Sequence, residues 1–515
     1  MASVQILNFC TYSVHGLREK KVISKKRVIF GVRCENGGNN NVYVNEDYGD
    51  KKKLKVLVAG GGIAGLVFAL AAKRSGFDVT VFEKDLTAVR GEGRDRGPIQ
   101  LLSSAMGLLE DIDKDVVREI METGYVTGDR TNGLADGKTG QWFTKFDFLT
   151  PALQKGIPVT QIICRMELQR VLLNAVGDDL VINNSKVVDF VTDANKVTAL
   201  LENGQQYEGD ILIGADGMRS MVRSKLFGTK DPKYSNFICY TGVAEFHPHY
   251  LPPFGYKIFI GRSSYFVALD IGKGRMQWYA FVREARESPL PSQGNKNMLL
   301  EGFGEWCDEV ITIIHRTQEH MIIRRPIHDI DMLKTWGKDR VILLGDAAHA
   351  MLPNLGQGGS MAIEDCYWLI QELRNLVETH PFHAISSHEF DLAFRRFEKK
   401  RMFRVGTVHA ICRAASVLTA FYSTYFNIGP LPLFAQKLSA TKLKHPALLV
   451  SSTLLKFALP KFMKWVVKGI PVTQIICRME QQRVLLNAVG DDLVINNSRV
   501  VDIVSDASKV SDLLS

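Results

Sequence analysis

KVLVAGGGIAGLVFALAAKRSGFDVTVFEK, residues 55–84, is the stretch that decides the fold. An apolar strand runs into Gly60-x-Gly62-x-x-Gly65, an alanine-rich helix follows, and a second apolar strand ends at Glu83. Glycines at this spacing permit a tight turn and let a pyrophosphate approach the backbone at a positive helix N-terminus. The acid after the second strand is placed to bind a ribose hydroxyl. In this complete context, the spacing predicts a dinucleotide-binding α/β fold.

A second segment, RVILLGDAAHAMLPNLGQGGSMAIED (340–365), joins a buried strand at 341–344 to Asp346 and a helix expected from about Met361. Because ligands bind at the carboxyl ends of parallel strands, Asp346 is positioned to accept a hydrogen bond from a ribityl or ribose hydroxyl. The loop also holds residues that let backbone amides approach a flat ring or a phosphate: Pro353, Gly356, Gly358 and Gly359. Taken alone, the stretch also fits an ordinary strand, loop and helix.

A third segment, GDILIGADGMRSMVR (209–223), is another apolar strand that runs into Asp216 and Gly217. We expect a helix carrying Arg219 and Arg223 to follow it. Three such segments in this order resemble the single-component FAD-dependent aromatic-hydroxylase-like monooxygenases, in which they are the nucleotide fingerprint, the DG motif and the GD motif.

The likeness is sharper to one group within that family, the plant zeaxanthin epoxidases. It is carried by RGPIQ (96–100), PVTQIICRMELQ (158–169), CYTGVAEF (239–246) and MQWYAF (276–281), and it covers roughly residues 50–467. Members of this group usually carry a forkhead-associated domain after the catalytic part, and nothing of that domain is visible in this sequence.

The resemblance implies FAD as cofactor and NADPH as a transient reductant, and the sequence has no second GxGxxG that would hold NADPH permanently. In the family, the fingerprint glycines approach the pyrophosphate, Arg165 lies along the ribityl side, and Asp346 holds the ribityl chain. The implied cofactor-binding residues are Gly60, Gly62, Ile63, Ala64, Gly65, Glu83, Lys84, Arg96, Arg165, Asp216, Gly217, Asp346, Pro353, Gly356, Gly358 and Gly359.

The implied activity is epoxidation of the β-rings of zeaxanthin to antheraxanthin and violaxanthin with O2 and NADPH, in xanthophyll and abscisic acid precursor biosynthesis. Ferredoxin and its reductase are possible electron donors. The flavin carries the chemistry, so we nominate no catalytic side chain and no metal. The 12 His and 8 Cys show no metal-ligand spacing, and we expect His349 to be structural. Two alternatives stay open: a hydroxylase of another aromatic or terpenoid substrate, and a flavin-binding pseudoenzyme.

The expected architecture is a Rossmann-like FAD-binding domain interleaved with a mainly β substrate domain, plus C-terminal helices. The FAD-binding domain should take residues 52–130, 155–230 and 325–385, and the substrate domain 231–324 with 131–154. Segments 237–246, 256–261, 264–272 and 275–282 alternate as strands do. Aromatic residues on these strands are candidates to line a pocket for a long apolar polyene: Tyr240, Trp278, Tyr279 and Phe281.

The net charge of +9 is concentrated at the start of the chain, because residues 1–34 hold seven Lys or Arg and one acid, which leaves +3 for the rest and disfavours nucleic-acid binding. We expect residues 1–50 to be a chloroplast transit peptide and linker. A disordered basic tail is the alternative. The scattered cysteines indicate free thiols in a reducing compartment.

The C-terminal part is predicted to be helical over 386–467. Residues 447–468 mix apolar side chains with lysines and are too short an apolar run to span a bilayer, so we expect peripheral contact with the thylakoid or envelope membrane. Packing on the FAD-binding domain is the alternative. Residues 155–197 recur at 468–510 with 38 of 43 positions identical, and Leu168 corresponds to Gln481. We expect this second copy to make no cofactor contact.

Overall fold

The computed structural model describes residues 53–87, 97–228, 231–245, 254–261, 264–288, 291–380 and 385–425. Our predictions for the transit peptide, the membrane-contacting segment, the second copy and Arg96 concern residues outside these ranges.

The nucleotide-binding sheet has the strand order β18-β19-β12-β1-β2-β8. Its strands are Gly337–Lys338 (β18), Val341–Leu343 (β19), Ile211–Gly214 (β12), Lys55–Ala59 (β1), Asp78–Phe82 (β2) and Val181–Ile182 (β8). All neighbours run parallel except β18, which pairs antiparallel with β19. Every residue of β12 and β19 is buried. Continuous apolar strands of this kind form because helices cover both faces of a parallel sheet.

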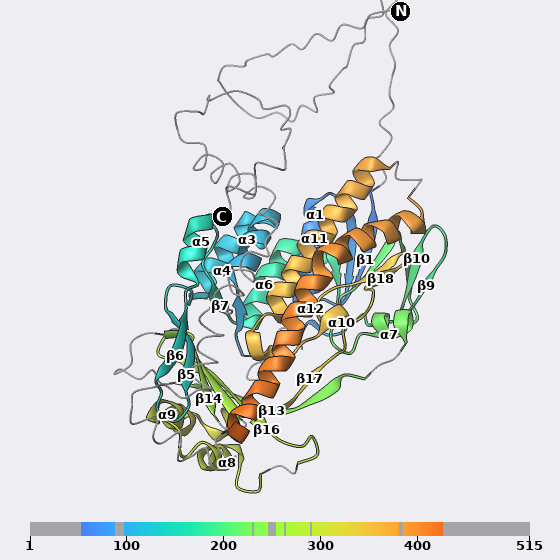
Figure 1. The fold of residues 1–515 in the computed structure, drawn as a ribbon. Helices are drawn as coiled ribbons and strands as arrows, with labels where there is room; N and C mark the ends of the chain where they lie inside the picture. The colour runs from blue at the N-terminus through green and yellow to red at the C-terminus, as the bar shows by residue number, and fades with distance from the viewer. Residues whose placement is uncertain are drawn as a thin grey trace, which may run out of the picture. The chain divides into compact units, whose positions relative to one another are not determined.

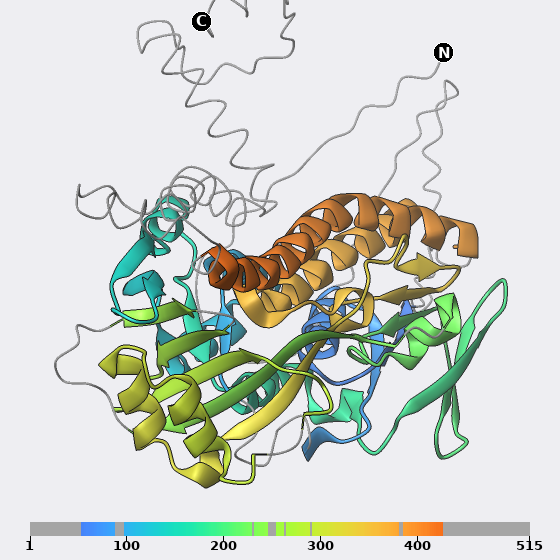
Figure 2. The same cartoon turned by 60° about the horizontal axis from the view of Figure 1, so that its bottom comes forward.

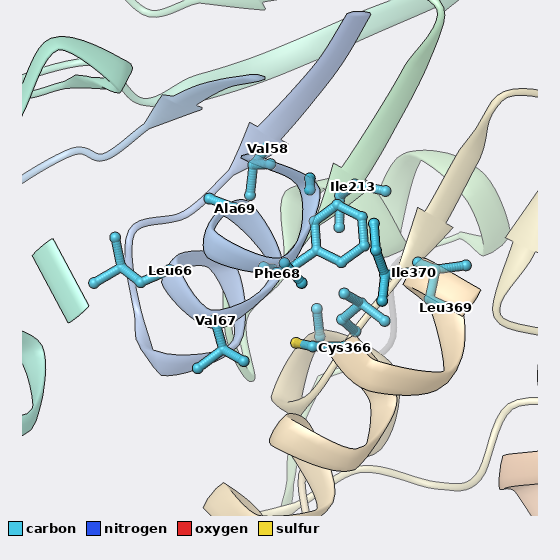
Figure 3. Close-up of a cluster of buried hydrophobic side chains, with 14 of the residues drawn as sticks. Val58, Leu66, Val67, Phe68, Ala69, Ile213, Cys366, Leu369 and Ile370 are labelled. Atoms are coloured by element: carbon cyan, nitrogen blue, oxygen red, sulfur yellow. The ribbon is translucent and has the colours of Figure 1, made fainter. Parts of the chain in front are cut away.

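Helices α1 (Ile63–Arg74) and α11 (Gly358–Thr379) pack against each other beside this sheet. Figure 3 shows the ring of Phe68, from α1, between Ile213 of β12 and Ile370 of α11. Phe68 is fully buried, and burial of such a side chain stabilises the fold by about 1.5–3 kcal/mol. The packing thereby fixes the two helix N-termini that the glycine-rich segments form.

The long helix α12 (Ser387–Tyr425) runs alongside α11 (Figures 1 and 2), as the prediction of C-terminal helices required. Helix α11 begins at Gly358, three residues before the predicted start at Met361. Glycines have low intrinsic helix propensity, which hid this first turn from the sequence pattern. Within the part of the chain that the structure describes, no helix is long and apolar enough to cross a membrane.

The second large sheet has the order β17-β13-β16-β15-β14-β5-β6. Its strands are Ile323–Asp329 (β17), Lys233–Ala244 (β13), Met276–Arg283 (β16), Ser264–Asp270 (β15), Phe254–Gly261 (β14), Thr131–Asp136 (β5) and Trp142–Phe146 (β6). The four predicted strands in 237–282 are thus confirmed. One face packs on α8 (Asn295–Gly302) and α9 (Asp308–Arg316), drawn in olive in Figure 2.

Two three-stranded sheets complete the fold: β3 (Ile99–Leu101), β7 (Gln161–Ile163) and β4 (Tyr125–Val126) form one, and β11 (Gln206–Gly209), β10 (Val197–Leu201) and β9 (Val187–Thr192) form the other. The segments VTQIIC (159–164) and VINNSKVVDFV (181–191) supply strands to different sheets. Helix α6 (Arg165–Val176) carries the chain from β7 to β8, and a turn with Asn184 at φ 54° then starts β9 in a separate sheet. The other α-helices of the described residues are α3 (Ser103–Ile112), α4 (Lys114–Thr123), α5 (Leu149–Lys155), α7 (Met221–Phe227) and α10 (Asp346–His349).

Candidate functional site

A cavity of about 470 Å³ lies where the carboxyl ends of the nucleotide-binding strands face the second sheet. Its walls include residues from the fingerprint, the DG motif and the GD motif, which are far apart in the sequence. Of the residues predicted from the sequence, the cavity is lined by Gly62, Ile63, Ala64, Arg165, Gly217, Tyr279, Phe281, Asp346, Pro353, Gly356, Gly358 and Gly359.

The three fingerprint glycines have different physical reasons for being glycine. A Cβ on Gly60, whose φ is 107°, would lie 2.4 Å from the carbonyl oxygen of Ala215, and one on Gly65 would lie 1.9 Å from the carbonyl oxygen of Gly60. A Cβ on Gly62 would meet no atom within 4 Å. Gly60 and Gly65 are therefore needed by the fold, whereas Gly62 leaves open space at the N-terminus of α1, where an anion is favoured.

Glu83 is buried at the end of β2 and holds the fingerprint loop in place. Its Oε2 accepts a hydrogen bond of 2.6 Å from the Gly61 amide, and its Oε1 accepts one of 2.9 Å from the Asp85 amide. Lys84, the next residue, is exposed. Neither Glu83 nor Lys84 lines the cavity, so the structure does not bring these two into contact with its interior.

Asp216 of the DG motif caps the helix that follows it. Its Oδ2 accepts hydrogen bonds from the amides of Met221 (2.8 Å) and Val222 (3.1 Å), and its Oδ1 is buried with no partner among the described residues. Arg223, buried on α7, donates a hydrogen bond of 2.9 Å to the carbonyl oxygen of Ala347. This arginine ties the DG motif to the GD motif. Arg219, predicted on the same helix, precedes it instead.

Asp346 opens α10 with its side chain exposed to the cavity. Its carboxylate has no hydrogen-bond partner among the described residues, so both oxygens are available to a ligand. Gly345 before it has a φ of 56°, and a Cβ on Gly359 would lie 2.5 Å from Cδ1 of Ile99. The N-terminus of α11, at Gly358, opens into the same space.

A buried ion network that sequence reasoning missed supports the GD motif from behind. Asp365 on α11 accepts hydrogen bonds from the Gly345 amide (3.1 Å) and from His349 Nε2 (2.6 Å) through Oδ2, and from Arg401 Nε (2.8 Å) through Oδ1. Arg401, on α12, also pairs with Glu364. His349 is buried in this network and does not line the cavity, which agrees with the expected structural role. His349 and Arg401 lie 16 and 36 residues from Asp365 in the sequence, and these spacings match no recognisable motif.

The second sheet forms the opposite wall, and strand alternation decides which aromatics reach it. Tyr279 and Phe281 of β16 point into the cavity. Tyr240 and Trp278 do not, and their assignment to the substrate pocket is corrected here. Both belong to the core on the far face of the sheet, where Tyr240 Oη donates to Glu284 (3.1 Å) and Trp278 stacks on Phe266. Neighbouring residues of a strand point to opposite faces, and the sequence pattern did not fix which face is which.

The residues present fit FAD. The open N-terminus of α1 suits a pyrophosphate, and the exposed Asp346 suits the hydroxyls of a ribityl chain. Arg165, the first residue of α6, is exposed and lines the same cavity. The side chains of Gln100 and Gln169 line it as well and leave Gln100 Nε2 and both amide atoms of Gln169 buried without a partner in the described structure. Buried polar atoms of this kind are costly unless they acquire a partner.

Comparisons with known proteins show the family and the cofactor class of the chain. An FAD-binding domain family matches residues 53–236 and 311–381. The chain is 48% identical to the chloroplastic zeaxanthin epoxidase of an Oncidium hybrid cultivar, over 82% of this chain and 63% of that one. It is 46% identical to the chloroplastic zeaxanthin epoxidase of Solanum lycopersicum, over 88% of this chain and 67% of that one. The chain thus spans somewhat less than two thirds of the length of the Oncidium relative.

Among solved structures, Klebsiella pneumoniae HpxO complexed with FAD and uric acid has the same fold. The TM-score is 0.65 at 24% sequence identity, and the match covers 81% of this chain and 98% of that one. The sequence relatives and the matched domain identify the chain as a member of the zeaxanthin epoxidase family, with an FAD-binding domain.

Proposed function

We propose that this protein is an FAD-dependent monooxygenase that epoxidises the β-rings of zeaxanthin with O2 and NADPH. The observation that carries the proposal is the cavity itself, because one wall consists of the three flavin-binding motifs and the other of an apolar sheet face. When bound, FAD supplies the reduction of O2 and the transfer of one oxygen atom to an electron-rich double bond.

The chain's own residues would hold the cofactor by three means. The open space at Gly62 takes the pyrophosphate at the N-terminus of α1, and Asp346 accepts hydrogen bonds from the ribityl hydroxyls. Gly356, Gly358 and Gly359, which line the cavity without side chains, would let the backbone approach the flat ring. Of the remaining predicted contacts, Arg165 and Gly217 of the DG motif line the same cavity.

The sheet wall would keep water away from the reacting atoms. Val267, Leu269 and Phe281 face the cavity and are almost fully buried, and the rings of Tyr265 and Phe281 stack at 4.3 Å between centroids. An apolar wall suits a carotenoid end ring and offers no base that would divert the reaction with O2 toward release of hydrogen peroxide. No side-chain nucleophile is needed.

The same assignment implies a cellular location, a contact with lipid and a source of electrons. Relatives named chloroplastic support a location in the plastid, and an insoluble substrate requires contact with lipid, for which 447–468 is the candidate segment. NADPH, directly or through ferredoxin and its reductase, is the proposed source of electrons. Removal of residues 447–515 should weaken binding to anionic and galactolipid vesicles; full-length protein that ignores both vesicle types would contradict membrane contact.

The test is an assay of purified protein with zeaxanthin in lipid, NADPH and a ferredoxin reducing system. We expect a yellow protein that releases antheraxanthin and then violaxanthin. Oxygenation of a smaller aromatic or terpenoid compound alone would favour the hydroxylase alternative, and NADPH oxidation without any oxygenated product would favour a flavin-binding pseudoenzyme. A folded protein that binds no flavin would overturn the whole assignment.

A further inference from the structure

Three tyrosines line the sheet wall of the cavity, and they differ in how their hydroxyl groups are bonded. Tyr265 Oη donates a hydrogen bond of 2.6 Å to Asn354 Oδ1, and Tyr279 Oη donates one of 3.3 Å to the carbonyl oxygen of Pro98. The hydroxyl of Tyr256 has no hydrogen-bond partner among the residues that the structure describes. This hydroxyl oxygen is not closed off from solvent either. Tyr256 Oη is therefore both unpaired and accessible from the cavity.

Tyr256 is held rigidly by its strand. It lies on β14, pairs with Leu269 of β15 and with Asn132 of β5, and packs against the apolar cluster that forms the cavity wall. Burial raises the pKa of its phenol, so the group stays neutral and can donate a hydrogen bond over the whole physiological pH range.

The other polar groups of this wall are less suited to a ligand. Asn354 is used fully, because its Nδ2 donates to Cys412 O and Ser416 Oγ, both at 2.7 Å, while its Oδ1 accepts from Tyr265. The rest of the wall is apolar. A ring hydroxyl that lies against the sheet wall would therefore meet in Tyr256 the one tyrosine of that wall whose hydroxyl has no partner among the described residues.

We propose that Tyr256 is a specificity-determining residue that hydrogen-bonds the ring hydroxyl of the substrate, so that hydroxylated β-rings are selected over unsubstituted ones. The inference rests on the proposed function, since each end ring of zeaxanthin bears one hydroxyl group and one ring double bond. A site built to pair a substrate hydroxyl discriminates against an analogue without it, because the protein group is then left unpaired.

The experiment uses β-cryptoxanthin, which carries one hydroxylated and one unsubstituted ring in the same molecule, so that differences in solubility or membrane partition cancel. The full-length wild type should place the epoxide mainly on the hydroxylated ring. Tyr256→Phe should lower this preference about tenfold. Tyr265→Phe is the matched control: its hydroxyl is already bonded within the protein, so the ring preference should persist even if the overall rate falls.

A binding arm separates this inference from the proposed function. The dissociation constants of 3-hydroxy-β-ionone and β-ionone are measured from the absorbance change of the bound flavin, without turnover. Wild type should favour the hydroxylated compound about tenfold, and Tyr256→Phe should bind the two alike. If wild type shows this preference but forms no epoxide, the proposed function fails and the assignment of Tyr256 stands. Unchanged preferences in Tyr256→Phe, with or without an altered flavin spectrum, would overturn the inference.

Discussion

Arg401 is the residue whose removal should reveal how the GD motif is held in place. Its side chain is fully buried and bonds Asp365 Oδ1 at 2.8 Å as well as Glu364. Removing one partner of a buried ion pair costs about 3–5 kcal/mol, because the remaining charge is left uncompensated. Each carboxylate keeps one partner: Glu364 keeps Arg404, whose Nη2 lies 2.7 Å from its Oε1, and Asp365 keeps His349 Nε2 at 2.6 Å. We therefore expect Arg401→Met to lower the free energy of unfolding by about 3 kcal/mol, the low end of that range.

The assay is urea unfolding followed by far-UV circular dichroism, with bound flavin measured in parallel. Flavin content should fall too, because Asp365 also fixes the Gly345 amide beside Asp346. Arg396→Met is the matched control: that arginine is half-exposed and shares Glu372 with Lys400, so the change should cost about 0–1 kcal/mol. Equal stability of the two variants would refute the reasoning.

The same network gives a pH dependence with a definite sign. Burial alone would raise the pKa of Glu364 and Asp365, but neighbouring Arg401, Arg404 and His349 outweigh it, so both pKa values are lowered in the folded protein from 4.5 and 3.8. A lowered carboxyl pKa contributes stability that is present above its unfolded value and is lost as the pH falls through the folded one. Wild type should lose stability below about pH 4.5, and Arg401→Met should lose less over this interval.

Four further substitutions and one truncation test the cofactor site. Asp346→Ala should weaken FAD binding about tenfold, measured by flavin titration, because the ribityl hydroxyls lose their acceptor; unchanged affinity would contradict that contact. Gly65→Ala should destabilise the protein itself by about 1–3 kcal/mol, since its Cβ would lie 1.9 Å from a backbone oxygen. Gly62→Ala should fold normally and retain less flavin. Equal thermal unfolding temperatures of the flavin-free Gly62→Ala and Gly65→Ala proteins would contradict the different roles given to these two glycines. Truncation after Gly469 should preserve flavin content and NADPH turnover, whereas Arg165→Ala should lower both; the reverse result would make the second copy the working one.

The buried position of Leu168 bears on which of the two copies lies beside the cavity. Leu168 is fully buried on α6, and the copy has Gln481 at the matching position. Placing an amide in that apolar site would cost free energy unless it found a hydrogen-bond partner. This supports the expectation that the first copy, and not the second, occupies the place beside the cavity.

Local sequence determined the nucleotide-binding half of this protein. The strand, the glycine spacing, the helix and the second strand follow one another within residues 55–84, so Gly60, Gly62 and Gly65 could be assigned to a nucleotide-binding fold from spacing alone. The alternating strands of the second sheet were predictable for the same reason. The role of Asp346 needed the resemblance carried by all three segments together.

Only the tertiary structure decided which side chains of each strand face the cavity and which face a hydrophobic core. The alternation of side chains along a strand does not distinguish its two faces. Whether Tyr279 or Trp278 lines the cavity therefore depends on what each face of the sheet packs against. The support of the GD motif by Arg401 and the unpaired hydroxyl of Tyr256 depend on groups from other elements, brought together by packing rather than by spacing. Such contacts form between residues distant in the chain, and no local pattern records them.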